Sequence, residues 1–311
     1  MHRRTVLALL PTAAAAFPER AITLVVPFAA GGSTDIAARM LGERLGVILG
    51  QRIVIENRTG AGGAVGSEAV KRANPDGHTL LFASASSHGA NPAIFRDLPY
   101  DALADFAPVA LTGITPLALA VPPGGAMDVA ALRRLLADGR GAYASAGAGS
   151  ITHLAAELFL QRAGLRAEHI PYRGGAPALE ALARAEVPFA FDTLAGLSAL
   201  AGDGRIRLLA AATSRPAAGL PTLETLGLAP FDISTWNALL APAATPPARV
   251  ALLAQAAHQA LAEPALATRL EGLGVAVPEP TGPAATGAFI AAEIAKFRAV
   301  AETAGLRLER P

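Results

Sequence analysis

The chain has 311 residues, enough for one domain or two, and 52% of them are hydrophobic while 16% are charged. The 26 basic and 25 acidic side chains nearly balance, and no basic stripe with interleaved aromatic residues points to nucleic acid. Cysteine is absent, which excludes disulfide bonds and thiol catalysis, and after the first sixteen residues charges and prolines interrupt every apolar run, so no membrane span is expected.

The first sixteen residues have the pattern of a secretory signal peptide. Arg3 and Arg4 precede an apolar stretch, and the alanines at 13–16 form a small-residue cleavage site. We therefore expect residues 1–16 to be removed and the protein to be periplasmic. Removal takes away two of the 26 basic residues and no acidic one, so the mature chain would carry a net charge of −1. An ordinary frayed N-terminus is the alternative.

Short apolar strands then alternate with amphipathic helices. This pattern predicts parallel sheets covered by helices on both faces. The elements expected in the first unit are strands at 21–27, 52–56 and 79–83 and helices at 35–49 and 64–73. After residues 121–125 the expected elements are strands at 142–145, 169–172, 187–192 and 206–212 and helices at 128–138, 151–162, 177–184 and 194–201.

Beyond residue 231 the pattern changes to one extended segment, 234–240, followed by long helices. Too little strand remains there for a third domain, so these helices are expected to pack on the first unit. They are predicted at 247–261, 264–273 and 285–304. We predict two α/β lobes joined by two crossovers, near 111–120 and 231–241. Lobe 1 would comprise residues 17–118 and 236–311, and lobe 2 residues 119–235.

Four loops share one design, at 28–35, 84–91, 145–153 and 173–177. Each follows a predicted strand, is rich in small residues and opens a predicted helix. Ligands of open α/β sheets bind outside the carboxyl ends of the strands, and a helix N-terminus offers unpaired N–H groups with a partial positive charge. One such turn can be plain architecture, but four together favour an anion site that needs no lysine or arginine.

Several side chains near these loops have two interpretations. Asp35 complements the helix dipole or orders its loop. Asp192 ends a strand, so it orients a water, accepts a ligand N–H or caps the next helix. His153 donates to a ligand or fills its helical turn. The hydroxyl groups with a similar choice, between helix cap and ligand donor, are those of Ser33, Thr34 and Ser150.

Other motifs are set aside. The glycine-rich stretch 60–66 precedes a predicted helix, but Val65 stands where a dinucleotide fingerprint requires glycine. There is no G-x-S-x-G elbow, and the histidine spacing fits no metal site, so no catalytic residue, metal or cofactor is expected. His169 and His258 lie near no motif.

Seven segments together resemble the signatures of one family. They are P-F-A-A-G-G-S-T-D-I-A-A-R (27–39), E-N-R-T-G-A-G-G-A-V-G (56–66), P-D-G-H-T-L-L (75–81), L-P-Y-D-A-L-A-D-F-A-P-V-A-L (98–111), Y-A-S-A-G-A-G-S-I-T-H-L (143–154), V-P-F-A-F-D (187–192) and S-T-W-N-A-L-L-A-P (234–242). In order and spacing they are similar to the Bug family of periplasmic solute-binding proteins, the receptors of tripartite tricarboxylate transporters. The likeness covers nearly the whole mature chain.

The resemblance implies an α/β type II periplasmic binding protein fold, with two lobes, each with a mostly parallel sheet, joined by two crossover strands. It also implies a small mono- or dicarboxylate ligand held by loop amides and ordered waters, and a two-subunit inner-membrane permease as partner. No cofactor is implied, and a monomer is the default. The implied ligand contacts are Phe28, Ala30, Gly31, Ser33, Thr34, Asp35, Ser84, Ser86, Ser87, Ala146, Gly147, Ala148, Gly149, Ser150, His153, Asp192 and Thr193.

Some positions depart from the family pattern. Ala148 and Thr193 stand where asparagine is common, and Ala185 and Pro188 replace a usual glycine and aspartate. These changes leave the identity of the carboxylate open. Two other functions remain open as alternatives: a ligand sensor that serves a membrane signalling receptor, and an enzyme acting on small carboxylates on the same scaffold.

Overall fold

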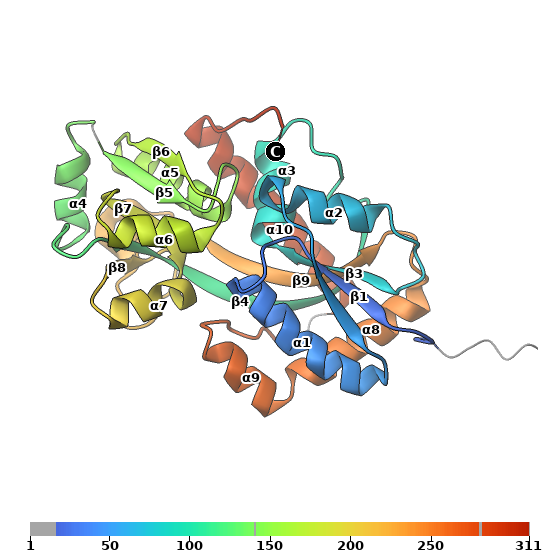
Figure 1. The fold of residues 1–311 in the computed structure, drawn as a ribbon. Helices are drawn as coiled ribbons and strands as arrows, with labels where there is room; N and C mark the ends of the chain where they lie inside the picture. The colour runs from blue at the N-terminus through green and yellow to red at the C-terminus, as the bar shows by residue number, and fades with distance from the viewer. Residues whose placement is uncertain (1–16, 140, 280–281, 311) are drawn as a thin grey trace, which may run out of the picture.

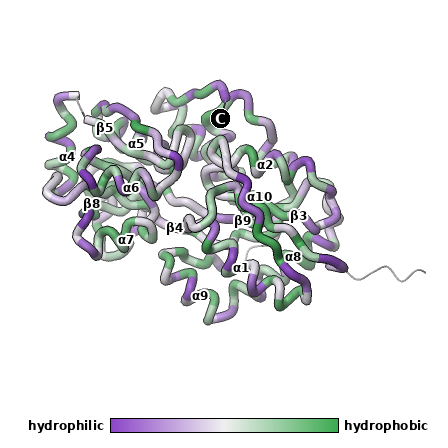
Figure 2. The backbone as a smooth tube through the Cα atoms, in the orientation of Figure 1, coloured by the Kyte–Doolittle hydropathy of each residue, from purple (hydrophilic) through white to green (hydrophobic). Residues whose placement is uncertain are grey.

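The computed structural model describes residues 17–139, 141–279 and 282–310, so the predicted signal peptide lies outside the described residues. Two lobes lie side by side and share one curled sheet (Figure 1). The strand order is β2-β1-β3-β9-β4-β7-β5-β6, with β8 paired to β4. In Figure 2 the strongly hydrophilic segments lie mostly on the outside of both lobes.

The first lobe is built on three parallel strands, β1 (Ile22–Val26), β2 (Ile53–Asn57) and β3 (Thr79–Ser84). Helix α1 (Ser33–Leu49) joins the neighbours β1 and β2, and α2 (Ala64–Lys71) leads from β2 past β1 to β3, so that β1 is central. A π-helical turn, Ser86–Ala90, and the short helix α3 (Asn91–Ile94) follow β3 and were not predicted.

The second lobe repeats the arrangement. Its strands β5 (Ala142–Ser145), β6 (Glu168–Pro171) and β7 (Phe189–Thr193) run parallel, with β5 in the middle. Strand β8 (Arg207–Ala211) pairs antiparallel with β4. The surrounding helices are α4 (Val129–Leu136), α5 (Ile151–Ala163), α6 (Gly175–Ala183) and α7 (Leu194–Gly202).

Two long strands connect the lobes. Strand β4 (Phe106–Val121) pairs with β9 (Ser234–Pro242) as far as Pro116, and from Leu117 onward it pairs with β7 and β8. The predicted crossover at 111–120 is therefore too short. Register shifts between β4 and β9 next to Pro108 and Gly113 accommodate these residues within the strand.

The C-terminal helices pack against different parts of the molecule. Helices α8 (Pro247–Leu261) and α9 (Pro264–Glu271) pack against α1 on the first lobe, as predicted. Helix α10 (Pro283–Ala304) packs on β4 and α3 but also on α5 of the second lobe. Its buried residues belong to the same core as the buried face of α5, so one apolar core extends through both lobes on this side. The residue-level lobe boundaries stay a prediction.

Candidate functional site

The predicted ligand loops lie at the edges of the two half-sheets, where the parallel strands end. Two contacts show that these edges meet across the lobes. The N–H of Ile151, the first residue of α5, donates to Ser86 Oγ of the first lobe at 3.4 Å. Phe95 packs on Gly149, where an added Cβ would lie 2.6 Å from the Phe95 ring. Glycine with φ +75° is therefore required at this contact.

Asp35 holds the first loop together from below. Its carboxylate is 2% exposed and accepts from the Gly31 N–H, from Arg39 Nε and from Asn57 Nδ2, each at 2.9 Å. Asn57 Nδ2 also donates to the carbonyl of Phe28 at 3.0 Å. Burial alone would raise the pKa of Asp35, but the hydrogen bonds together lower it. The geometry favours the loop-ordering interpretation of Asp35.

Unbonded N–H groups of this loop lie two and three residues beyond Gly31. The N–H of Gly31 already donates to Asp35, so it is not free for the ligand contact that the sequence predicted. Helix α1 starts after Gly32 without a side-chain cap. Within the described part of the chain, the N–H groups of Ser33 and Thr34 have no partner. The loop backbone from Ala30 to Ser33 is exposed, so a ligand can approach these groups.

The three predicted serines after β3 divide into two kinds. Ser84 and Ser87 bond to each other: the Ser84 N–H donates to Ser87 Oγ at 3.1 Å, and Ser87 Oγ donates to the Ser84 carbonyl at 3.3 Å. Tyr100 holds the same turn by donating to the Ser87 carbonyl. Ser86 is the serine that reaches the second lobe, through Ile151. Ser84 and Ser87 thus shape the turn that presents Ser86.

In the second lobe most loop N–H groups are bonded internally. The N–H of Ala146 donates to Thr152 Oγ1 at 2.9 Å, and that of Gly147 donates to Ser145 Oγ at 3.1 Å. The N–H of Gly149 donates to His153 Nδ1 at 3.2 Å. Ala148, at the exposed tip, has an N–H without a partner among the described residues. Ser150 caps α5, since its Oγ accepts the His153 N–H at 3.2 Å.

His153 is buried rather than open to a ligand. It is 4% exposed, and its ring stacks on His169 with 3.9 Å between centroids. Burial, and then the neighbouring His169, lower the pKa of His153 to about 3. His169 was set aside in the sequence, yet it lies directly under the predicted loop. The available signal was strand register. His169 lies two residues before the end of β6 and pairs with Tyr143, which belongs to the motif 143–154.

Asp192 and Thr193 lie where two helices begin. Thr193 caps α7 by accepting the Gly196 N–H at 3.1 Å, and Asp192 Oδ1 accepts the Thr193 N–H at 2.7 Å. The other Asp192 oxygen lies against Gly175 of α6, where an added Cβ would be 2.7 Å away. Burial raises the pKa of Asp192 to about 6. Thr193 itself provides the helix cap, and Asp192 supports it.

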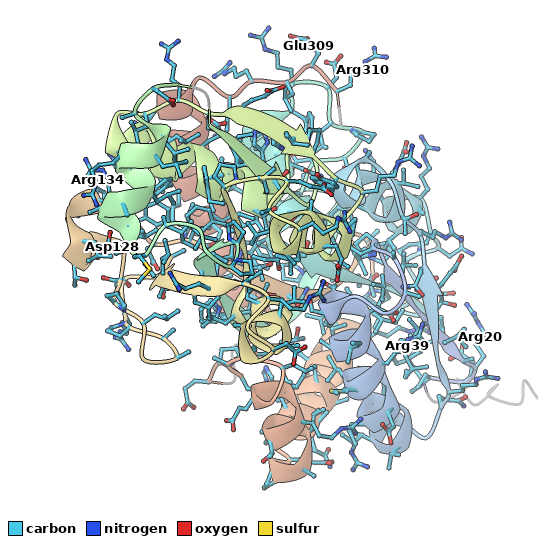
Figure 3. The ribbon with its side chains drawn as sticks, turned by 60° about the vertical axis from the view of Figure 1, so that its left-hand side comes forward. Arg20, Arg39, Asp128, Arg134, Glu309 and Arg310 are labelled. Atoms are coloured by element: carbon cyan, nitrogen blue, oxygen red, sulfur yellow. The ribbon has the colours of Figure 1, made fainter. Side chains whose placement is uncertain are left out.

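Two asparagines were not singled out from the sequence. Asn57 links Asp35 to the Phe28 carbonyl, as described above. Asn91 is fully buried, donates to the Gly62 carbonyl at 3.1 Å and lies against Gly149 of the second lobe. Asn57 falls inside the quoted motif 56–66, which was the available signal. The charged Arg39 extends outward from α1 (Figure 3) and is half exposed.

This fold and these facing loops define a two-lobed solute-binding protein. Residues 37–306 match the tripartite tricarboxylate transporter family receptor, and the chain belongs to that family. It is similar to protein BugT of Bordetella pertussis, with 35% identity over 96% of this chain and 94% of BugT. These findings confirm the family and the fold predicted from the sequence.

Two solved structures are similar over nearly the whole chain. Rpa4515 of R. palustris with adipate is 32% identical, with a TM-score of 0.88 over 94% of this chain and 99% of that one. MatC of Rhodopseudomonas palustris with bound malate is 33% identical, with a TM-score of 0.85 over 91% and 99%. The family and these neighbours are solute-binding receptors, not enzymes. Among the described residues, no helix combines the length and the apolar character of a membrane span.

Proposed function

We propose that the protein captures a small carboxylate between its two lobes and delivers it to a two-subunit permease in the inner membrane. The observation that carries this proposal is a pair of unbonded backbone N–H sets on opposite lobes. Ser33 and Thr34 supply one set at the uncapped start of α1, and Ala148 supplies the other. Ala148 lies three residues before Ile151, whose N–H donates to Ser86 of the first lobe.

The chemistry of these groups suits an anion. A helix N-terminus combines free N–H donors with a partial positive charge, and each hydrogen bond to a charged group contributes about 1.5–3 kcal/mol. Two opposed sets bind a carboxylate better when the lobes close, so the ligand stabilises the closed form. The adipate and malate bound to the two solved neighbours are carboxylates and support this ligand class.

The remaining parts of the proposal concern location and assembly. Removal of residues 1–16 would place a monomeric, cofactor-free receptor in the periplasm, where family members act as binding proteins. Closure would then create the surface that the permease recognises, because the relative position of the lobes is what the ligand changes.

The direct test is a thermal-shift screen of residues 17–311 against a panel of mono- and dicarboxylates that includes adipate and malate. A ligand at a hundredfold excess over its Kd adds about 2.7 kcal/mol to the free energy of unfolding, so the melting temperature should rise. Calorimetry of each hit gives the Kd, and the uncharged diamides of the same acids are the matched controls. Equal shifts by acids and diamides, or no shift by any acid, would contradict the proposal.

A further inference from the structure

Two histidines of the second lobe lie directly beneath the loop Ala146–Ser150. His153 comes from the first turn of α5 and His169 from β6. Their rings are nearly parallel, with an interplanar angle of 11° and centroids 3.9 Å apart. A contact this close between two titratable rings is unnecessary for packing alone, because aliphatic side chains fill such a space as well.

The stacked pair is fixed by a row of rings across the sheet. Tyr143 of β5 is in register with His169 of β6 and with Phe189 of β7. Its ring stacks on His169 at 5.0 Å and on Phe189 at 5.5 Å between centroids. The Tyr143 hydroxyl donates to Glu157 on α5, which ties the helix to the strands. The two imidazoles therefore have little freedom to move.

Each histidine is bonded to one end of the loop. His153 Nδ1 accepts the N–H of Gly149 at 3.2 Å. His169 Nε2 shares a hydrogen bond of 2.6 Å with Ser145 Oγ. Ser145 Oγ in turn donates to the Gly147 carbonyl and accepts the Gly147 N–H, both at 3.1 Å. The tip between these two anchors is Ala148, whose N–H is left exposed.

We propose that His153 and His169 are positioning residues for anion binding, which fix the loop so that the Ala148 N–H points to the ligand. This rests on the proposed function, because it concerns the same site. The anchor on Gly149 requires a neutral His153. A protonated Nδ1 of His153 cannot accept the Gly149 N–H, and two imidazolium rings at this distance repel each other.

The groups around the pair favour the neutral state. Glu157 Oε1 lies 3.9 Å from His153 Nε2, beyond hydrogen-bond distance, and it already accepts from Tyr143. Facing His169 are Ser145 and the Tyr143 ring, which carry no charge. Burial lowers the pKa of His169 to about 4 and, together with His169, that of His153 to about 3. The His153 anchor is thus intact at neutral pH and is lost in acid. The His169–Ser145 bond tolerates protonation, because Nε2–H is its donor.

Four variants distinguish the effect of losing the hydrogen bonds from the effect of losing the volume of the rings. Asn at 153 places an amide oxygen near the position of Nδ1, and Gln at 169 places an amide near that of Nε2, whereas Leu at either position retains only volume. We expect His153→Leu and His169→Leu to weaken adipate or malate binding about tenfold or more, as loss of one hydrogen bond implies. His153→Asn and His169→Gln should restore affinity to within about threefold of the wild type.

Tyr143→Phe is the matched control. It retains the ring row and removes only the bond to Glu157, so it should lower stability and change the Kd less than either leucine variant does. Calorimetry near neutral pH measures the Kd, and circular dichroism confirms folding. Wild-type affinity in a folded His153→Leu protein, or an equal loss in His153→Asn, would overturn the proposal.

A second readout needs no ligand. In ¹⁵N-labelled protein the Gly149 amide resonance should shift as pH falls below about 5, where His153 and His169 begin to protonate, and it should stay constant in the His153→Asn/His169→Gln variant. A Gly149 resonance that is the same in wild type and His153→Leu would refute the anchor. If the wild type binds no carboxylate, the proposed function fails, and this amide measurement still decides whether the histidines hold the loop.

Discussion

Asp35 shows how a buried carboxylate orders a candidate binding loop. Three donors, Gly31, Arg39 and Asn57, surround its oxygens, and they keep it ionised in spite of its burial. The carboxylate fixes the loop while the helix start beyond it stays uncapped. The unbonded backbone N–H groups at this helix start include those of Ser33 and Thr34.

The first prediction tests the N–H of Ser33. Ser33 is the first residue of α1, a position where proline fits, and Gly32 before it has the extended φ and ψ that proline requires. Helices α8, α9 and α10 of this chain already begin with proline. Ser33→Pro removes the N–H without breaking the helix, so the melting temperature should hold while carboxylate affinity falls about tenfold.

Ser33→Ala is the matched control, because it removes the hydroxyl and retains the N–H. Calorimetry should give it a Kd close to that of the wild type. Should the proline variant bind as tightly as the alanine variant, the backbone N–H of Ser33 has no part in binding.

The second prediction concerns Asp35 itself. Asp35→Ala removes the acceptor of the Gly31 N–H and one of the two acceptors of Asn57 Nδ2, so the free energy of unfolding should fall by about 2–3 kcal/mol. Arg39 is half exposed, so Arg39→Ala should cost less than about 1 kcal/mol. Urea unfolding measures both, and equal losses would show that the ion pair, rather than the loop network, matters.

At the scale of elements, the starts of α1 and α5 differ in how they are capped and contacted. The start of α1 is uncapped, while that of α5 is capped by Ser150 and also contacted by Ser86 from the other lobe. Ser86 is thus the point where the turn after β3 joins the second lobe. The bond is long, at 3.4 Å, but its donor, the Ile151 N–H, lies on a buried residue.

The third prediction is that Ser86→Ala favours the open form. Without Ser86 Oγ the Ile151 N–H gains a partner only when the lobes separate and water enters. Small-angle scattering of the ligand-free variant should give a larger radius of gyration than the wild type, and carboxylate binding should weaken. Ser198→Ala is the control, since among the described residues the Ser198 hydroxyl bonds only to the Leu194 carbonyl within α7. An unchanged radius of gyration for Ser86→Ala would show that the Ser86–Ile151 bond does not hold the lobes together.

For the whole molecule, proton binding links stability to pH. Burial lowers the pKa of His88 and His153 to about 3 and that of His169 to about 4, from an ordinary value of 6.5. Between about pH 6.5 and 4 the unfolded chain binds these protons first, so stability falls as pH falls. Asp192, with its pKa raised to about 6, opposes this, because the folded chain keeps that proton longer.

The fourth prediction follows because three histidines with lowered pKa values outweigh one carboxyl, Asp192, with a raised pKa. The urea midpoint should decrease as pH is lowered from about 6.5 to 4, and the decrease should be smaller in the His153→Asn/His169→Gln variant. The urea midpoint is measured at pH steps of half a unit and at fixed ionic strength. A midpoint that stays level or rises over this range would mean that the histidines are not held neutral by the fold.

Much of this architecture was readable from the sequence. The strands and helices lie within a residue or two of their predicted bounds, because apolar periodicity and the glycine turns are local signals. The family motifs marked the loops correctly as strand-to-helix connections. The length of β4 was missed because Pro108 and Gly113 signal a break unless a partner strand absorbs them in bulges.

The sequence by itself determined the class of fold and the loops that form the candidate site, since both depend on short-range patterns. Only the tertiary structure decided which groups in those loops are free. The N–H groups of Gly31 and Gly149 are taken by Asp35 and His153, and His169 joins the site through strand register. Hydrogen-bond partners depend on atoms brought within about 3 Å by folding, which no spacing along the chain specifies.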